Sequence, residues 1–89
     1  MIVKIDKTFQ KDIRKLNNRE ISLKVALIIE QVQKAPSINQ IQNLKKLKTS
    51  DNSYRIKLGD YRLGITISDS EVEFVRCLHR KDIYKYFPK

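Results

Sequence analysis

The strongest constraint on the fold is a change in the spacing of apolar residues in the second half of the chain. Between residues 53 and 68 apolar side chains occupy every second position, as in Tyr54-Arg-Ile-Lys-Leu58 and Tyr61-Arg-Leu-Gly-Ile65. A period of two places successive side chains on opposite faces of a β-strand. Gly59-Asp60, between the two runs, is a two-residue turn of the kind that closes a hairpin. The spacing therefore predicts an antiparallel β-hairpin.

The N-terminal third has the helical period instead. Residues 2–6 are typical of a short strand, and Asp6 is a suitable N-cap for the helix that follows. Phe9, Ile13 and Leu16 recur at helical spacing and form one apolar stripe. The pattern predicts a strand followed by a first amphipathic helix.

A second helix is predicted after a short break in the pattern. Asn17 followed by Glu20 is similar to a capping box, with Asn in place of Ser or Thr. The apolar residues of 21–32 again have helical spacing, and Pro36 ends the helix just after Lys34. Because the connection is so short, we expect the two helices to pack as an antiparallel hairpin.

The rest of the chain predicts a loop, one more strand and a C-terminal tail. Residues 37–52 are polar and have no clear period, which indicates a loop with room for one helical turn. Asp69-Ser70 makes a second turn, and residues 71–78 form a third strand that is apolar on both faces. Residues 79–89 are a basic, aromatic tail.

The predicted order is strand, helix, helix and then three strands. This order predicts an α+β fold. An N-terminal strand and a three-stranded antiparallel meander form one mostly antiparallel sheet, with the helix hairpin on one face. Arg55, Lys57 and Arg62 lie on the other face, because alternation places them away from Ile56 and Ile65. A solvated basic strand face is the plain alternative to a binding surface.

Composition limits the classes of function. The 89 residues suffice for a single domain, 1–89, and carry a net charge of +9, which favours nucleic acids, acidic proteins or anionic membrane surfaces as partners. The single Cys77 excludes an internal disulfide and a cysteine zinc site, and we expect it to be a buried strand residue. No apolar run approaches the roughly 18 residues of a membrane span, and the start is unlike a signal peptide. We therefore expect a soluble cytoplasmic domain with no membrane partner.

Two segments together resemble a known family. Tyr54-Arg-Ile-Lys-Leu-Gly-Asp-Tyr-Arg62 and Leu78-His-Arg-Lys-Asp-Ile-Tyr84, with Leu44-Lys-Lys-Leu47 before them, resemble the RelE toxins of the RelE/ParE superfamily. These are bacterial toxins encoded beside an antitoxin. The order of elements agrees, so the resemblance covers nearly the whole chain. It implies a RelE-like fold and an endoribonuclease (mRNA interferase) that cleaves messenger RNA in the ribosomal A site and so inhibits translation.

The resemblance also implies the chemistry and the partners. Cleavage uses no metal and no cofactor: a ribose 2′-hydroxyl attacks the neighbouring phosphate and leaves a 2′,3′-cyclic phosphate. The implied partners are messenger RNA, the ribosome with its ribosomal RNA, and a cognate antitoxin protein. A toxin–antitoxin hetero-oligomer is the assembly that this pairing implies.

Roles are carried over residue by residue. The implied catalytic residues are Lys57, Arg62, Arg80 and Tyr84, and His79, the single histidine of the chain, is a further catalytic candidate from its own chemistry. Further basic and aromatic residues in or next to these segments are expected to bind RNA, and they are Arg55, Lys81, Lys45, Lys46, Lys48, Lys85, Tyr86 and Phe87. Lys81 is an alternative to Arg80 for the distal cation, and Tyr86 or Phe87 is an alternative to Tyr84 for the aromatic.

The residue types suit the steps of the reaction. Scission through a 2′-hydroxyl needs a base, cations near the developing phosphorane charge and an acid for the leaving 5′-oxygen. The cationic neighbours of Lys57 would lower its pKa and make it a base. His79, with an ordinary pKa of about 6.5, is the other candidate for the first proton. Arg62 and Arg80 can grip a phosphate in bidentate fashion, and Tyr84 can stack on a base.

Two positions depart from the family pattern, and two other functions stay open. Arg55 stands where RelE toxins have a lysine, and an arginine cannot act as a base near neutral pH. Phe87 has no hydroxyl, so only stacking would remain for it. Because the superfamily contains ParE-like inhibitors of DNA gyrase that lack the RNase residues, gyrase inhibition is the alternative function. The third possible function is that of a basic binding module, in an inactive relative of these toxins.

Overall fold

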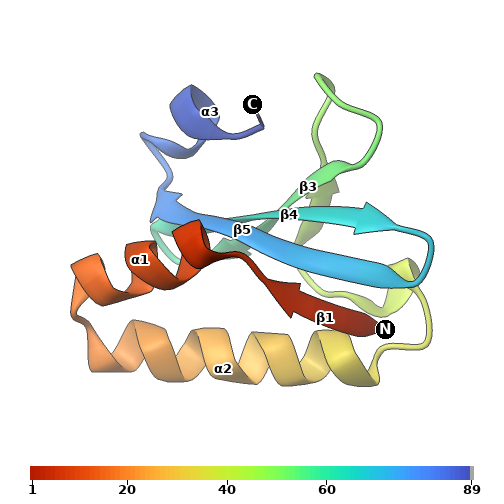
Figure 1. The fold of residues 1–89 in the computed structure, drawn as a ribbon, viewed down its shortest axis with the longest axis horizontal. Helices are drawn as coiled ribbons and strands as arrows, with labels where there is room; N and C mark the ends of the chain where they lie inside the picture. The colour runs from red at the N-terminus through yellow and green to blue at the C-terminus, as the bar shows by residue number, and fades with distance from the viewer. Residues whose placement is uncertain (89) are drawn as a thin grey trace.

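In the computed structural model, which describes residues 1–88, two helices lie on one side of a five-stranded sheet and a one-turn helix lies on the other (Figure 1). The elements in chain order are β1 (Ile2–Ile5), α1 (Lys7–Leu16), α2 (Arg19–Lys34), the 3-10 helix η1 (Ile38–Gln40), β2 (Leu44–Lys46), β3 (Ser53–Leu58), β4 (Tyr61–Ser68), β5 (Glu71–His79) and α3 (Ile83–Tyr86). Over the described residues, no helix has both the length and the apolar character needed to cross a membrane.

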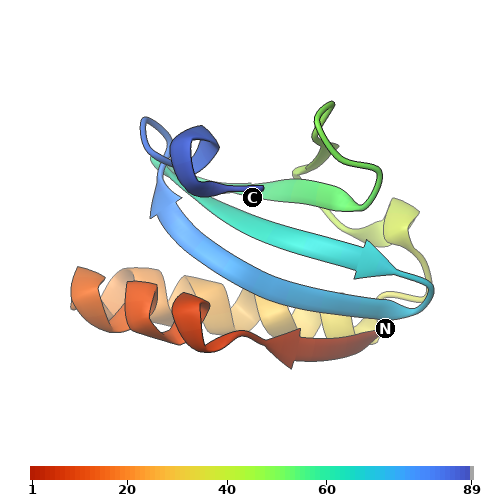
Figure 2. The ribbon, with the colours of Figure 1, turned by 45° about the horizontal axis from the view of Figure 1, so that its top comes forward.

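The sheet has the strand order β1-β5-β4-β3-β2. β1 is parallel to β5, and the other neighbouring strands are antiparallel. Figure 2 shows α1 and α2 together beneath the sheet, with α3 and the β2–β3 loop above it. The predicted α+β fold, with a mostly antiparallel sheet and a helix hairpin on one face, is confirmed.

The sheet contains one strand that the sequence did not predict. β2 lies in the region expected to be a loop, and its three residues pair with β3, with Leu44 opposite Ile56. Three residues are too few to show a period of two, and an edge strand this short is defined by its partner rather than by its own pattern. The helical turn allowed for in this region is present as η1.

The two long helices begin at polar caps. The carboxylate of Asp6 accepts a hydrogen bond from the N–H of Thr8 at 2.9 Å, as the sequence predicts for an N-cap. The cap of α2 is Asn18, whose Oδ1 accepts from the N–H of Ile21 at 3.1 Å. Asn17 instead ends α1 in the left-handed conformation, with φ 47°, which Asn tolerates. The predicted capping position is therefore wrong by one residue, because adjacent asparagines divide the two roles.

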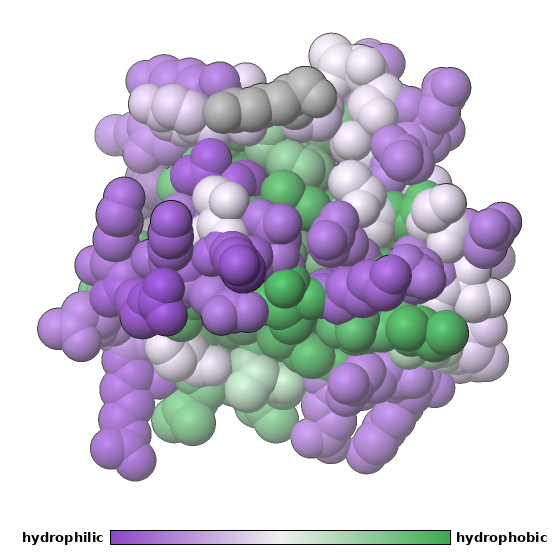
Figure 3. Space-filling model, viewed as in Figure 1, coloured by the Kyte–Doolittle hydropathy of each residue, from purple (hydrophilic) through white to green (hydrophobic). Residues whose placement is uncertain are grey.

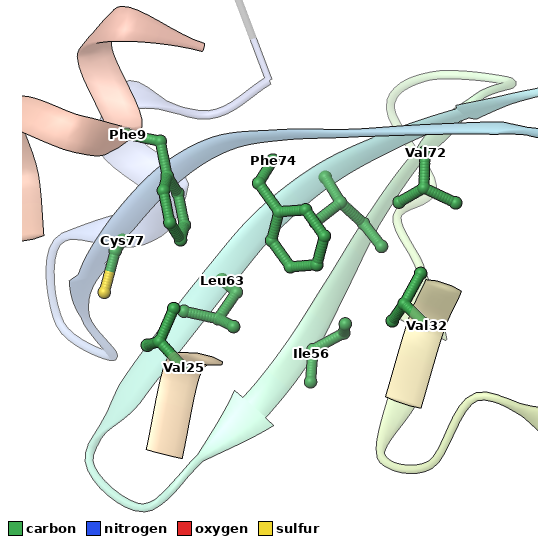
Figure 4. Close-up of a cluster of buried hydrophobic side chains, with 9 residues drawn as sticks. Phe9, Val25, Val32, Ile56, Leu63, Val72, Phe74 and Cys77 are labelled. Carbon is green, nitrogen blue, oxygen red and sulfur yellow. The ribbon is translucent and has the colours of Figure 1, made fainter. Parts of the chain in front are cut away.

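The main core lies between the sheet and the helix pair (Figure 4). Its buried side chains, each 4% exposed or less, are Phe9, Val25, Val32, Ile56, Leu63, Ile65, Val72, Phe74 and Cys77. The rings of Phe9 and Phe74 meet edge to face with centroids 5.5 Å apart, an arrangement favoured between aromatic rings. The predicted apolar face of the hairpin and the predicted burial of Cys77 are confirmed.

A second, smaller core lies on the opposite face of the sheet, beneath residues 80–88. Ile83 and Phe87 pack there with Leu47. The ring of Phe87 rests directly on Gly64, where an added Cβ would be 2.7 Å from it. Phe87 is only 4% exposed, so its ring has no face on which a base could stack. The RNA-binding role expected for Phe87 is therefore corrected to a packing role.

A bulge in β5 explains why this strand is apolar on both faces. Consecutive residues of β4 pair with Phe74 and Arg76, so Val75 is an extra residue between them. The extra residue reverses the alternation. Cys77 therefore faces the same core as Phe74, while Leu78 joins Val75 on the opposite face. The bulge also sets the position of Arg76 next to α1.

Candidate functional site

The predicted basic residues of the hairpin share the sheet face that the two long helices leave open. Lys57 pairs directly with Arg62, and Arg55 pairs with Gly64 on one side and with Lys45 of β2 on the other. Cross-strand partners project from the same face, and so do residues two apart in one strand. The predicted shared face of the three hairpin cations is confirmed, and Lys45 belongs to it. We call these four residues the basic face.

The turn between β3 and β4 brings a further cation to this end of the sheet. Nη1 of Arg62 donates to the carbonyls of Gly59 at 2.7 Å and of Tyr61 at 2.8 Å. The backbone N–H of Arg80 donates to the carbonyl of Asp60 at 2.7 Å. The side-chain Nε of Arg80 lies 3.9 Å from Oδ1 of Asp60. Arg80 therefore comes from the turn after β5 and sits at the same hairpin turn as Arg62. Its side chain is 57% exposed, so the guanidinium faces solvent.

His79 lies away from the basic face. It pairs with Tyr61, and the two rings meet edge to face with centroids 5.7 Å apart. Because Tyr61 precedes Arg62 in β4, this ring pair projects toward the helix side of the sheet. Nδ1 of His79 accepts the N–H of Lys81 at 3.2 Å. The sheet therefore separates the imidazole from Lys57.

The C-terminal aromatics divide into exposed and buried positions. Tyr84 and Tyr86 of α3 are 59% and 48% exposed, while Ile83 and Phe87 hold the segment on the sheet. The ring of Tyr86 lies 5.6 Å from the guanidinium carbon of Arg76, within the range of a cation–π contact. Of the three aromatic candidates, Tyr84 and Tyr86 present rings to solvent.

The other predicted RNA-binding lysines do not converge on one point. Lys46 pairs with Tyr54, so it projects toward the helix side of the sheet. Lys48 follows β2, Lys81 lies in the turn after β5 and Lys85 is on α3, and all three are exposed. These four lysines therefore come from different elements and do not form one cluster with the cations of the hairpin turn.

The hairpin turn thus combines three cations that suit a phosphodiester. Arg62 and Arg80 supply planar guanidinium groups with several N–H donors each, and Lys57 supplies an exposed amine. Such donors stabilise negative charge that develops on a phosphate. Within residues 1–88 no group of three His, Cys, Asp or Glu side chains is placed to hold a metal ion.

A buried ion pair beside the open face was not predicted. Asp12 is 6% exposed; its carboxylate accepts from Nε of Arg76 at 2.8 Å, from Nη2 at 3.2 Å and from the N–H of Cys77 at 3.0 Å. This hydrogen-bonded carboxylate raises the pKa of the Arg76 guanidinium. The sequence did contain a sign of this burial. Asp12 lies three residues after Phe9 and next to Ile13, so it falls within the apolar stripe of the helix.

A helix hairpin on one face of a mostly antiparallel sheet, with the other face left open to solvent and to the C-terminal segment, is the fold of the RelE/ParE class of toxins. Residues 3–84 match the family model described as "ParE toxin of type II toxin-antitoxin system, parDE". The chain therefore belongs to this family.

Several relatives of the chain are RelE proteins. The chain is 43% identical over 89 residues to Toxin RelE3 of Methanocaldococcus jannaschii, covering 99% of this chain and 100% of the relative. It is similar to the toxin in the RelB-RelE antitoxin-toxin complex from Methanococcus jannaschii, with 41% identity, a TM-score of 0.80, and 96% and 99% of the two chains covered. The toxin-antitoxin complex RelBE2 of Mycobacterium tuberculosis matches at 25% identity and a TM-score of 0.62, covering 89% and 96%. The chain is a RelE-like toxin of the type II toxin–antitoxin class.

Proposed function

We propose that this toxin is an endoribonuclease that cleaves messenger RNA on the ribosome without a metal ion. The observation that carries the proposal is that Lys57 and Arg62 pair across β3 and β4, while the backbone of Arg80 bonds to Asp60 in the turn that joins these strands. The similarity to RelE toxins supports the same reaction. The basic face, with Arg55 and Lys45 beside this turn, offers further positive charge to an RNA backbone.

The reaction requires a balanced transfer of two protons. The ribose 2′-oxygen forms a bond to the adjacent phosphorus, and the bond from phosphorus to the 5′-oxygen breaks. The base takes the 2′-hydroxyl proton, and an acid returns a proton to the leaving 5′-oxygen. The products are a 2′,3′-cyclic phosphate and a 5′-hydroxyl. Arg62 and Arg80 would stabilise the extra negative charge on the phosphorane oxygens.

We assign the first proton to Lys57 in preference to His79. Lys57 shares a face with Arg62, whereas His79 projects to the other side of the sheet with Tyr61. Arg55, the other cation of β3, can bind phosphate but cannot accept a proton. Tyr84 is the aromatic residue that we assign to stacking on an RNA base, because its ring is mostly exposed.

We propose an antitoxin as the protein partner. The related toxin at 41% identity was solved in a complex described as RelB-RelE antitoxin-toxin. A chain with a net charge of +9 attracts an acidic or amphipathic segment laid over its basic face. Such a segment would compete with RNA for the same cations, so binding would silence the toxin.

The test is induced expression of the full chain in bacteria, with growth and the 5′ ends of transcripts followed together. Wild type should arrest growth and cut coding sequences in phase with codons. Arg62→Ala and Arg80→Ala should each lower the cleavage rate by about 10²–10³-fold, as losing a group that stabilises transition-state charge does. Lys24→Ala, on the helix side of the molecule, is the control with the same charge change and should behave as wild type.

Other outcomes would point to other functions. Full toxicity of both arginine variants would refute the assigned residues. DNA damage with intact transcripts would support gyrase inhibition instead. Harmless expression, with RNA affinity that falls steeply with salt and no cleavage, would support a basic binding module.

A further inference from the structure

A cleft of about 380 Å³ lies on the open face of the sheet, apart from the hairpin turn. Its floor is a row of three paired residues, Ser53, Thr66 and Glu73, from β3, β4 and β5. Thr66 is four residues along β4 from Arg62, which at about 3.3 Å per residue puts the cleft roughly 13 Å from that cation.

The cleft contains an unpaired acceptor. Among residues 1–88, Glu73 has no Lys, Arg or His nitrogen within 4.0 Å. Lys4, its neighbour on β1, directs its Nζ to Glu71 at 3.0 Å. A carboxylate on the floor disfavours a phosphate there and favours a ligand with N–H donors.

Arg76, which also lines the cleft, is an oriented donor. Asp12 binds Nε and Nη2 of Arg76, which fixes the guanidinium plane and leaves Nη1 unused by that pair. The ring of Tyr86 lies 5.6 Å from the same guanidinium and is 48% exposed at the mouth of the cleft. The cleft therefore offers an acceptor, a donor and a flat aromatic surface.

We propose that this cleft binds a guanine base of single-stranded RNA, an inference that rests on the proposed function. Guanine carries two adjacent N–H donors, N1–H and the N2 amino group, that suit the carboxylate of Glu73. Its O6 and N7 are acceptors that suit Arg76. Its ring can stack on Tyr86, as unpaired RNA bases do on aromatic side chains. Adenine has no N1–H and no N2 amino group, so it would leave the carboxylate without donors.

The pairing of acceptor and donor gives the cleft a role distinct from that of the hairpin turn. The cations of the turn contact phosphates, which carry no sequence information, whereas Glu73 and Arg76 would contact a base edge, which does. Both lie on one face of the sheet, so one RNA strand could touch both. The cleft would set which base sits near the cut, and the turn would perform the chemistry.

The test is equilibrium binding of fluorescent oligoribonucleotides to the purified full chain, with 2′-O-methyl groups on the riboses to prevent cleavage. One position carries guanine, inosine or adenine in an otherwise uracil sequence. Wild type should bind the guanine strand about 5- to 100-fold more tightly than the adenine strand, with inosine between them because it lacks only the N2 amino group. Glu73→Gln should lose this preference, and Glu71→Gln should keep it.

Glu71→Gln is a matched control because it removes the same charge from the same strand outside the cleft. Thermal unfolding of both variants checks that the fold is intact. Equal affinity of wild type for the three strands, or a preference that survives Glu73→Gln, would overturn the guanine site. Either result leaves the nuclease proposal untouched, because that proposal depends on cleavage and on the arginines of the turn.

Discussion

At the scale of single residues, burial controls the chemistry of Cys77. Its side chain is 1% exposed in the main core, and its backbone N–H donates to the carboxylate of Asp12 at 3.0 Å. Burial first, and the charge of Asp12 second, raise the pKa of the thiol from 9.0 to about 12. Because the thiolate is the nucleophilic form, this cysteine is inert in the folded protein, in agreement with its predicted packing role.

The same pKa shift predicts how stability depends on pH. The pKa of the thiol is higher in the folded than in the unfolded chain. The contribution of the thiol to the stability of the fold is therefore complete below about pH 9 and is lost as the pH rises to about 12. Over that interval the thiol should lower the free energy of unfolding by about 1.4 kcal/mol per pH unit. Urea unfolding of wild type and of Cys77→Ala across this pH range measures the loss of stability that is due to the thiol, because the variant has no thiol to titrate. Parallel pH profiles for the two proteins would contradict the burial of an uncharged thiol.

At the scale of elements, the contact between Gly64 of β4 and Phe87 fixes the C-terminal segment on the sheet. A Cβ on Gly64 would be 2.7 Å from two ring atoms of Phe87, and that ring is buried and cannot swing away. Gly64→Ala should therefore destabilise the protein by about 1–3 kcal/mol, the usual cost of overpacking. Phe87→Leu should relieve the clash, so the double variant should be more stable than the two single effects predict.

Urea unfolding of the two single variants and the double variant measures this coupling. Ser68→Ala, at the exposed end of the same strand, is the control for a small substitution in β4 and should change stability little. If the effects of Gly64→Ala and Phe87→Leu simply add, the ring does not rest on the glycine.

Elements with a long, regular pattern were predictable from the sequence, and elements that depend on a partner were not. The alternation of residues 53–68 and the helical stripes specify β3, β4, α1 and α2, because each pattern spans several repeats. β2 has three residues and is visible only through its pairing with β3.

The residues of the candidate site also divide into those that the sequence could place and those that it could not. Alternation placed Lys57 and Arg62 on one face, since both belong to regular strands. It could not place His79, because the bulge between Phe74 and Arg76 reverses the alternation of β5 before the strand reaches it. The fold of the C-terminal tail onto Gly64 was equally hidden, because a basic, aromatic segment has no period that indicates which ring is buried.

At the scale of the whole molecule, the net charge of +9 is divided between two sides of the sheet. The basic face lies on one side, while α1 and α2, on the other side of the sheet (Figure 1), carry their own lysines and arginines. Figure 3 shows hydrophilic side chains, in purple, over these two helices. Part of the helix charge is already paired, as in the 3.0 Å contact between Lys24 and Glu20. If RNA lies on the basic face, only the charges of that face should contribute to its binding.

The salt dependence of RNA binding tests this division. For single strands, the logarithm of the binding constant falls with the logarithm of salt concentration by about 0.7 for each phosphate neutralised. Lys57→Ala should therefore reduce the slope by about 0.7, while Lys24→Ala should leave the slope unchanged. Each substitution removes one exposed lysine and one positive charge; Lys57 lies on the basic face, whereas Lys24 lies on the helix side and contacts Glu20 at 3.0 Å. A slope that responds equally to both would mean that RNA senses the net charge of the molecule and has no preferred face.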